Sequence, residues 1–193
     1  MLRSLYDWTM RLAARKHALW ALAAISFAES SVFPIPPDVL IIPIILSARE
    51  RALAVAVVAT LASVAGGLAG YGIGHFLFEE LGRPILAFYG ATATFESFRA
   101  GYNAWGGWIV AMAGFTPFPY KVVTIASGVF GLDLSTFMVA SAVSRGARFF
   151  LEAALLWYLG PPVRRFVESN LQWLATLFFV LLFAGFLIVR YLT

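Results

Sequence analysis

Cysteine is absent from this chain of 193 residues, histidine occurs only at His17 and His75, and charged residues make up 12%. The absence of cysteine excludes a disulfide framework and a thiolate nucleophile. Two histidines give little support for a metal site, so we expect no cofactor. Hydrophobic residues make up 61% and aromatic residues 16%, well outside the usual composition of a soluble domain. The composition predicts an integral membrane protein.

The basic residues outnumber the acidic ones, which gives a formal charge of +4. They lie at the ends of apolar stretches and do not form a basic face with interleaved aromatics. Nucleic-acid binding is therefore not expected.

Two short segments interrupt the apolar chain with proline and charge, residues 29–38 (ESSVFPIPPD) and residues 114–121 (GFTPFPYK). Proline removes a backbone donor and disfavours helical geometry in the residue before it. Non-helical backbone at membrane depth survives only where protein buries it or where it lines a watery cavity. Each break predicts a re-entrant helical hairpin, over residues 18–48 and 106–131, and together they predict a site.

Longer apolar stretches predict full spans, because a helix needs about 20 residues to cross a bilayer. The order of hairpin, span, connector, hairpin, span and final span predicts an all-α fold with two opposed hairpins as inverted repeats. About three full transmembrane helices and some amphipathic surface helices complete it. The predicted parts are an amphipathic helix over 1–17, a membrane domain over 18–160 with spans over 52–78 and 134–158, a connector over 79–105 that forms a pair of surface helices, and a cytoplasmic connector with a C-terminal transmembrane helix over 161–193.

The cations favour a cytoplasmic amino terminus. In that orientation eight Lys and Arg residues lie inside and three outside, as the positive-inside tendency requires. An alternative is that residues 18–28 belong to a signal peptide with small residues at its cleavage site. Cleavage would remove the first arm of the hairpin and leave Glu29 at a new terminus, so the hairpin is the favoured interpretation.

Three cations belong to no predicted loop: Lys121 at the second break, and Arg145 and Arg148 near the middle of a span. A charge at membrane depth costs roughly 2.5 to 3.5 kcal/mol on insertion scales, so it normally faces a partner or a cavity. Ser141, Arg145, Arg148 and Glu152 recur at spacings of four, three and four, which places them on one helix face. This face is the candidate site.

Two interpretations of this face remain open. In the structural one, Arg148 pairs with Glu152, and Arg145 pairs with Glu29 or Asp38, which leaves a neutral scaffold. In the functional one, a surplus cation holds an anionic group, since the planar arginine fork suits phosphate. Lys121 is the third candidate for substrate binding.

The acids have two interpretations as well. Asp38 follows two prolines and precedes an apolar arm, so it is placed to cap a helix. Glu29 has only serines as polar neighbours before the break, so it is a candidate proton carrier or a structural partner of an arginine. We assign charge balance or proton coupling to Glu29, Asp38 and Glu152.

Gly66, Gly70 and Gly74 recur at intervals of four in the first span. Glycines at this spacing let helices approach closely in lipid. They predict a packing face.

Several of these motifs resemble the DedA superfamily, also described by the VTT domain, and within it the YqaA-like branch. They are the glutamate followed by residues 33–38 (FPIPPD), residues 70–74 (GYGIG), the stretch over residues 115–128, and the two later arginines. The resemblance covers residues 18–160. It implies opposed re-entrant hairpins in the bacterial inner membrane, transport of lipid carriers such as undecaprenyl phosphate or of phospholipids, and dependence of some members on proton motive force. This chain departs from the pattern at the second break, where it has Lys121 in place of two arginines.

The leading functional hypothesis is a lipid flippase or scramblase in which the cations receive a lipid phosphate. The alternative is a proton-coupled antiporter of small ions that uses the acids. An enzyme is not expected, because no histidine and acid constellation lies near the breaks and there is no cysteine nucleophile. The expected partners are phosphate-bearing lipids and protons, and symmetry within one chain or a homo-oligomer would serve.

Overall fold

The computed structural model describes residues 17–33, 36–116, 118–160 and 162. Every regular element in these ranges is helical, as predicted. The predicted amphipathic helix over 1–17 lies outside them except for its last residue, and so does the predicted C-terminal span. The elements are α2 (Ala18–Ser31), α3 (Asp38–Ser47), the 3₁₀ turn η1 (Arg49–Arg51), α4 (Ala52–Leu77), the π-helical turn η2 (Phe78–Gly82), α5 (Arg83–Phe88), α6 (Thr92–Phe115), α7 (Tyr120–Val129) and a helix over residues 134–160.

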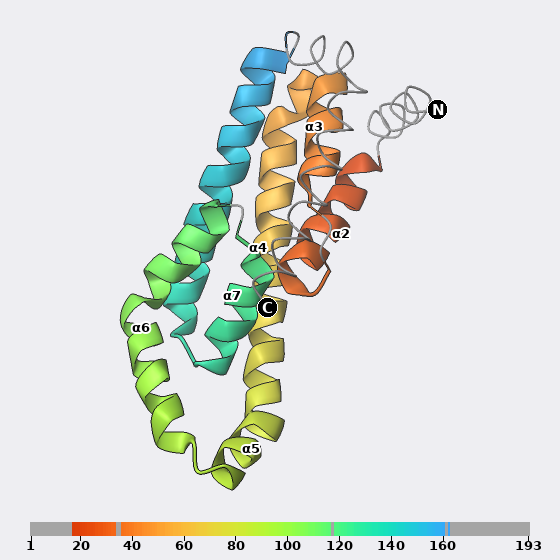
Figure 1. Ribbon diagram of the computed structural model, residues 1–193. Coiled ribbons are helices and arrows are strands. Elements are labelled where there is room, and N and C mark those ends of the chain that lie inside the picture. Colours follow the sequence, from red (N-terminus) through yellow and green to blue (C-terminus); the bar gives the residue numbers. More distant parts are fainter. Residues whose placement is uncertain (1–16, 34–35, 117, 161, 163–193) are drawn as a thin grey trace, which may run out of the picture.

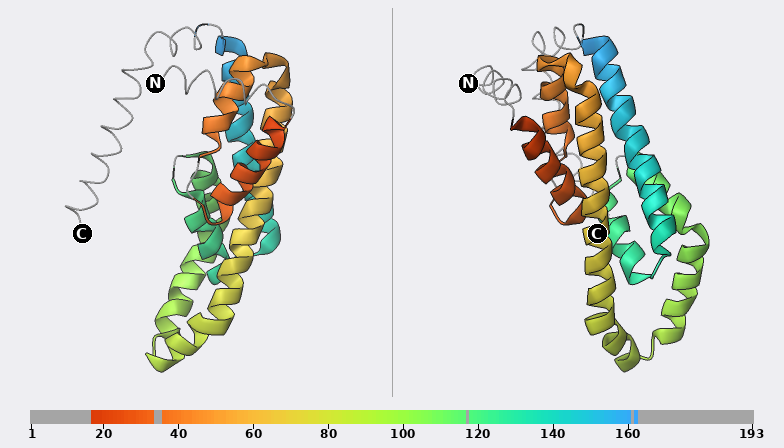
Figure 2. Two further views of the ribbon diagram at one scale, coloured as in Figure 1. Left: turned by 90° about the vertical axis from the view of Figure 1, so that its right-hand side faces the viewer. Right: turned by 180° about the vertical axis from the view of Figure 1, so that it is seen from behind.

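Both proline breaks end a helix, as expected. Within the first break the chain leaves α2 after Ser31 and enters α3 directly after Pro37, and within the second it leaves α6 after Phe115 and enters α7 directly after Pro119. Figures 1 and 2 show that the turn between α2 and α3 points one way along the molecule and the turn between α6 and α7 points the other way. Both turns lie near the middle of the molecule.

Helix α4 is the central element, with α2 and α7 packed against it (Figure 1). A Cβ atom on Gly66 would collide with the backbone carbonyl of Phe27 in α2, and one on Gly74 would collide with the carbonyl of Ile125 in α7. The predicted glycine packing face is therefore confirmed, and it serves both hairpins. This close approach fixes where the two turns lie.

The second hairpin has a longer first arm than the sequence suggested. Helix α6 begins at Thr92, so residues that we expected in the connector belong to the helix that leads into the second turn. Aromatic contacts explain the extension. The Phe95 ring stacks on Phe78 at 4.6 Å and on Phe130 at 5.5 Å, and these contacts tie the start of α6 to the ends of α4 and α7.

Among the helices that the structure describes, the continuous stretch Arg49–Phe88 is the one long and apolar enough to cross a membrane. It contains the predicted span over 52–78. Ala18–Ser31 and Asp38–Ser47 are apolar but short, as expected for the arms of a hairpin. The helix over residues 134–160 runs beside α4 (Figure 2), but three charged residues in its middle lower its hydropathy. The number of full spans, and re-entry of the hairpins, remain predictions.

The described core consists of two apolar clusters. The first joins α2, α3 and the start of α4 to Phe149, Ala153 and Leu156. The second joins α6 and α7 to Leu132 and Phe137. The helix over residues 134–160 contributes to both clusters, and its charged middle lies where one gives way to the other.

Candidate functional site

Two arginines project from the middle of the helix over residues 134–160. Arg145 and Arg148 are three positions apart, so they lie on one face of that helix. The helix starts after Asp133, whose carboxylate accepts a 2.8 Å hydrogen bond from the Thr136 N–H and so caps the first turn. Because this helix passes both hairpin turns, the arginine face meets the two proline breaks.

Arg145 is enclosed by protein and is only 2% exposed. Its Nη2 donates to Glu29 Oε2 at 2.8 Å, and its Nε donates to Ser63 Oγ at 2.6 Å. The guanidinium also lies over the rings of Tyr120 and Phe149, at 4.9 Å and 4.6 Å from their centroids. A buried cation requires such pairing. Of the two partners expected for Arg145, the structure selects Glu29.

Serine and threonine hydroxyls extend this arrangement between elements. Ser30 Oγ shares a 2.7 Å hydrogen bond with Ser63 Oγ and donates to Glu29 Oε2 at 3.1 Å. The Thr124 hydroxyl of α7 donates to the Ser30 carbonyl at 3.2 Å. Each of these buried polar groups has a partner, as a stable interior needs. Together they hold α2, α4 and α7 around Arg145.

Sequence reasoning missed Ser63 and assigned no role to Tyr120. Ser63 is a hydroxyl residue in the apolar, glycine-rich part of α4, three positions before Gly66. A polar residue in such a stretch could have indicated a buried hydrogen-bonding role. Tyr120 is fully buried and donates a 2.5 Å hydrogen bond to Ser141 Oγ. Its place directly after Pro119 in the second break could have indicated that it faces the site.

Arg148 joins the two turns and stays partly open. Its Nη2 donates to the Asp38 carboxylate oxygens at 3.2 and 3.3 Å, and its Nη1 donates to the Thr116 carbonyl at 3.3 Å. Asp38 is the first residue of α3, and Thr116 directly follows α6. The side chains of Arg148 and Asp38 are 26% and 29% exposed, whereas Arg145 is closed off.

The pair expected between Arg148 and Glu152 within one helix is wrong. Arg148 pairs instead with Asp38, because the first hairpin brings the start of α3 against the arginine face. No side-chain cap is present at the start of α3, so capping does not explain Asp38. Glu152 lies one helical turn beyond Arg148 on the same face, and it interacts electrostatically with the Asp38 carboxyl and with both arginines.

Residues 35–158, more than half of the chain, match the family model of the VTT domain. The chain belongs to this DedA family. It is therefore a membrane protein of the DedA superfamily, as its motifs indicated. The matched VTT segment contains Asp38, Arg145, Arg148 and Glu152, whereas Glu29 precedes it.

Two relatives match over most of their length. An uncharacterized protein of Haemophilus influenzae is 38% identical over 152 residues, which is 79% of each chain. An uncharacterized protein of Histophilus somni is 32% identical over 187 residues, which is 97% of each chain. No solved structure gives a significant match to this chain.

Lys121 lies in the first turn of α7 within the VTT domain and is half-buried. Among the described residues, no ion pair or hydrogen bond links its ammonium group to the other charged side chains. The structure therefore brings together five of the six predicted site residues and leaves Lys121 beside them. No group of three or more His, Cys, Asp or Glu side chains that could hold a metal occurs in the described ranges.

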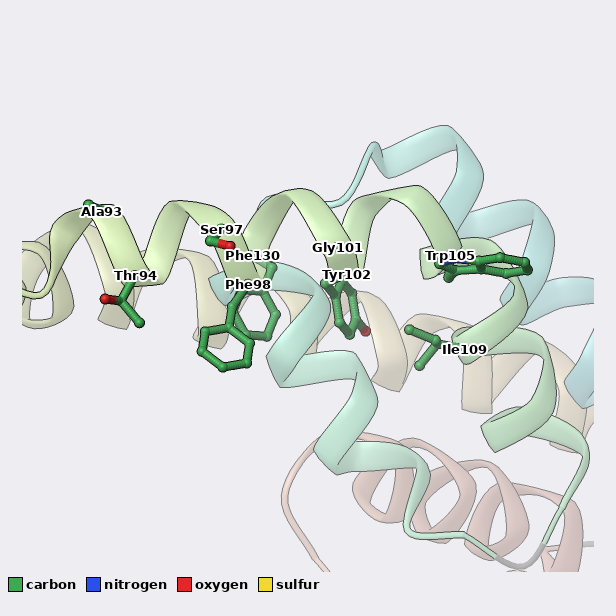
Figure 3. Close-up of a pocket in the computed structure, with 9 residues that line it drawn as sticks. All are labelled: Ala93, Thr94, Ser97, Phe98, Gly101, Tyr102, Trp105, Ile109 and Phe130. Carbon is green, nitrogen blue, oxygen red and sulfur yellow. The ribbon is translucent and has the colours of Figure 1, made fainter.

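A separate apolar cavity of about 830 Å³ lies along α6 (Figure 3), and neither Arg145 nor Arg148 lines it. The rings of Phe98, Tyr102, Trp105 and Phe130 line much of it. The Tyr102 hydroxyl shares a 2.9 Å hydrogen bond with Ser127. Among the described residues, no charged side chain lines this cavity.

Proposed function

We propose that this chain moves a phosphate-bearing lipid, such as undecaprenyl phosphate or a phospholipid, across the bacterial inner membrane as a flippase or scramblase. The observation that carries the proposal is the position of Arg148. Its guanidinium joins the start of α3 to the end of α6 and remains 26% exposed. A cation that touches both breaks and is still accessible is suited to receive an anionic group between them.

The geometry at Arg148 favours exchange. Its hydrogen bonds measure 3.2 to 3.3 Å, which is long for charge-assisted contacts. Arginine binds phosphate through two parallel N–H groups, and the same Nη2 now holds Asp38. A lipid phosphate would displace Asp38 and accept hydrogen bonds from two parallel N–H groups of the Arg148 guanidinium. In this proposal Arg145 stabilises the site by holding Glu29 and Ser63, and Lys121 is a further contact for the headgroup.

The hairpins supply the path in this proposal. Each turn exposes non-helical backbone, which membrane proteins tolerate only against protein or a watery cavity. If the α2–α3 hairpin enters from the cytoplasm and the α6–α7 hairpin from outside, the turns meet near the bilayer centre as an inverted repeat. The arginine face then lies where a headgroup would cross.

The test reconstitutes the purified protein in liposomes and follows transbilayer movement of fluorescent undecaprenyl phosphate and of a fluorescent phospholipid. Arg148→Gln should abolish movement while the protein stays folded. Arg148→Lys should keep part of it, because lysine retains the charge but not the fork. Arg83→Gln is the matched control, since Arg83 forms a surface pair with Glu79 and its side chain is 60% exposed. Movement that survives in Arg148→Gln would contradict the proposal.

A proton-coupled antiporter of small ions is the second candidate. The observation that favours it is the excess of acids over arginines at the site: Glu29, Asp38 and Glu152 face two cations. This function predicts ion flux across the same liposomes with no movement of either lipid. Loss of that flux in Asp38→Asn would identify it.

A further inference from the structure

The charges at the arginine face do not balance. Arg145 and Arg148 contribute two positive charges, and Glu29, Asp38 and Glu152 contribute three negative ones when all are ionised. One uncompensated negative charge in a partly buried cluster is costly. A bound proton removes it, so the question is which carboxyl group holds that proton.

Glu29 is the wrong candidate on geometry. Its Oε2 accepts hydrogen bonds from Arg145 at 2.8 Å and from Ser30 at 3.1 Å. Both donors stabilise the ionised form. Among the described residues, no second acid lies as close to Arg145, which is closed off from water, so Glu29 and Arg145 neutralise each other.

Arg148, in contrast, serves two acids. Its ion pair is with Asp38, and Glu152 faces the same Asp38 carboxyl. One cation cannot neutralise two carboxylates, and two adjacent carboxylates disfavour double ionisation. Such pairs commonly keep one proton between them.

The surroundings of this pair contain no further compensating charge among the described residues. The helix over 134–160 presents Arg145 and Arg148, α3 presents Asp38, and α2 presents Glu29, which is held by Arg145. From α7, Tyr120 faces Arg145, and no described contact links Lys121 to either acid. The proton therefore belongs to Asp38 and Glu152.

We infer that Asp38 and Glu152 share one exchangeable proton, and that an anion bound at Arg148 adds a second. This step rests on the proposed function. When a lipid phosphate carrying one negative charge displaces Asp38 from Arg148, the freed carboxylate loses its cation. It takes a proton from water, and the charge of the site is unchanged. The pair of Asp38 and Glu152 thereby couples anion binding to protons.

The first readout is independent of transport. Infrared spectra of the full chain in liposomes at neutral pH should contain the C=O stretch of a protonated carboxyl group. Glu152→Gln and Asp38→Asn should each lose this band, because one acid then remains for Arg148. Glu79→Gln should retain it as the control, because Glu79 pairs with Arg83 at the surface and lies outside the cluster, and Arg148→Gln should strengthen it. A band that persists in Glu152→Gln, or that disappears only in Glu29→Gln, would overturn the inference.

The second readout is the pH dependence of lipid movement in the same liposomes. Movement by the unchanged protein should accelerate as the pH falls, and in the double variant Asp38→Asn with Glu152→Gln this dependence should be lost, because no acid then remains beside Arg148 to take up the proton. An unchanged pH profile in the double variant would overturn the coupling even if the lipid moves. If no lipid moves but the infrared band behaves as expected, the proposed function fails and the shared proton stands.

Discussion

At the scale of single residues, the two arginines differ although the sequence makes them look alike. Arg145 has two short hydrogen bonds, an acid and two aromatic rings. Arg148 has longer contacts and access to solvent. A buried charge held by an acid and a hydroxyl is structural, whereas an accessible charge with exchangeable partners can take part in binding. The fold therefore makes Arg145 structural and leaves Arg148 accessible for binding, although both are arginines on one helix face.

This difference predicts different consequences of the same substitution. Arg145→Gln should lower the free energy of unfolding by about 3–5 kcal/mol, because it leaves Glu29 buried without its cation. Arg148→Gln should cost much less, since water reaches the site. The measurement is unfolding in mixed detergent micelles, followed by circular dichroism.

A double substitution serves as the control. Glu29→Gln with Arg145→Gln removes both charges and should recover part of the lost stability. If Arg145→Gln were as stable as Arg148→Gln, the structural role of Arg145 would be disproved.

At the scale of helices, α4 determines where both hairpins lie. Gly66 touches the α2 backbone, and Gly74 and Gly128 bring α4 and α7 together. Without side chains at these positions, the helices approach closely enough for dispersion contacts to replace the missing hydrophobic driving force in lipid. Helix contact and site geometry are thus linked through α4.

The glycines allow a test with an internal control. Gly74→Ala places a methyl group on the Ile125 carbonyl and should lower the free energy of unfolding by about 1–3 kcal/mol. Gly72→Ala has no atom within 4 Å of its new methyl group and should be neutral or stabilising by up to about 1 kcal/mol, because alanine favours helix. Equal effects in the same unfolding assay would show that α4 and α7 do not pack through Gly74.

At the scale of the whole molecule, two hairpins of opposite direction share one charged helix. The arginines contact Glu29 and Asp38 from the first hairpin and Thr116 from the second. The two apolar clusters are separate, so the charged face, together with the Thr124–Ser30 hydrogen bond, connects the halves through polar groups. A relative movement of the halves would therefore act first on Arg148, whose contacts are the longest.

The opposed hairpins predict that both ends of the first hairpin face the cytoplasm and both ends of the second face the outside of the membrane. Because the chain lacks cysteine, single cysteines can be labelled with an impermeant maleimide, in intact cells from the outside and in inside-out vesicles from the cytoplasmic side. His17→Cys and Glu50→Cys, at the two ends of the first hairpin, should label from the cytoplasm only. Tyr89→Cys and Leu134→Cys, around the second hairpin, should label from outside.

Tyr89 and Leu134 are 76% and 47% exposed, so failure to label would reflect the membrane side. Labelling of His17→Cys and Glu50→Cys from opposite sides would show that the first hairpin crosses the membrane. That result would exclude re-entry and the inverted repeat.

The sequence by itself determined the local features. Proline placed the breaks because it removes a donor and restricts its neighbour. The spacing of Arg145, Arg148 and Glu152 fixed one face because helical periodicity is a property of neighbouring residues. The glycine spacing predicted close packing for the same reason. The sequence also contains the motifs that resemble those of the VTT domain family, to which the chain belongs.

Only the tertiary structure decided which charges meet. Glu29 and Arg145 are 116 positions apart, and Asp38 and Arg148 are 110 positions apart. Local periodicity favoured Arg148 with Glu152, yet the packing of α3 brought Asp38 closer. Partners so far apart in the chain depend on how helices pack, and this packing depends on backbone contacts at glycine that leave no charge pattern in the sequence.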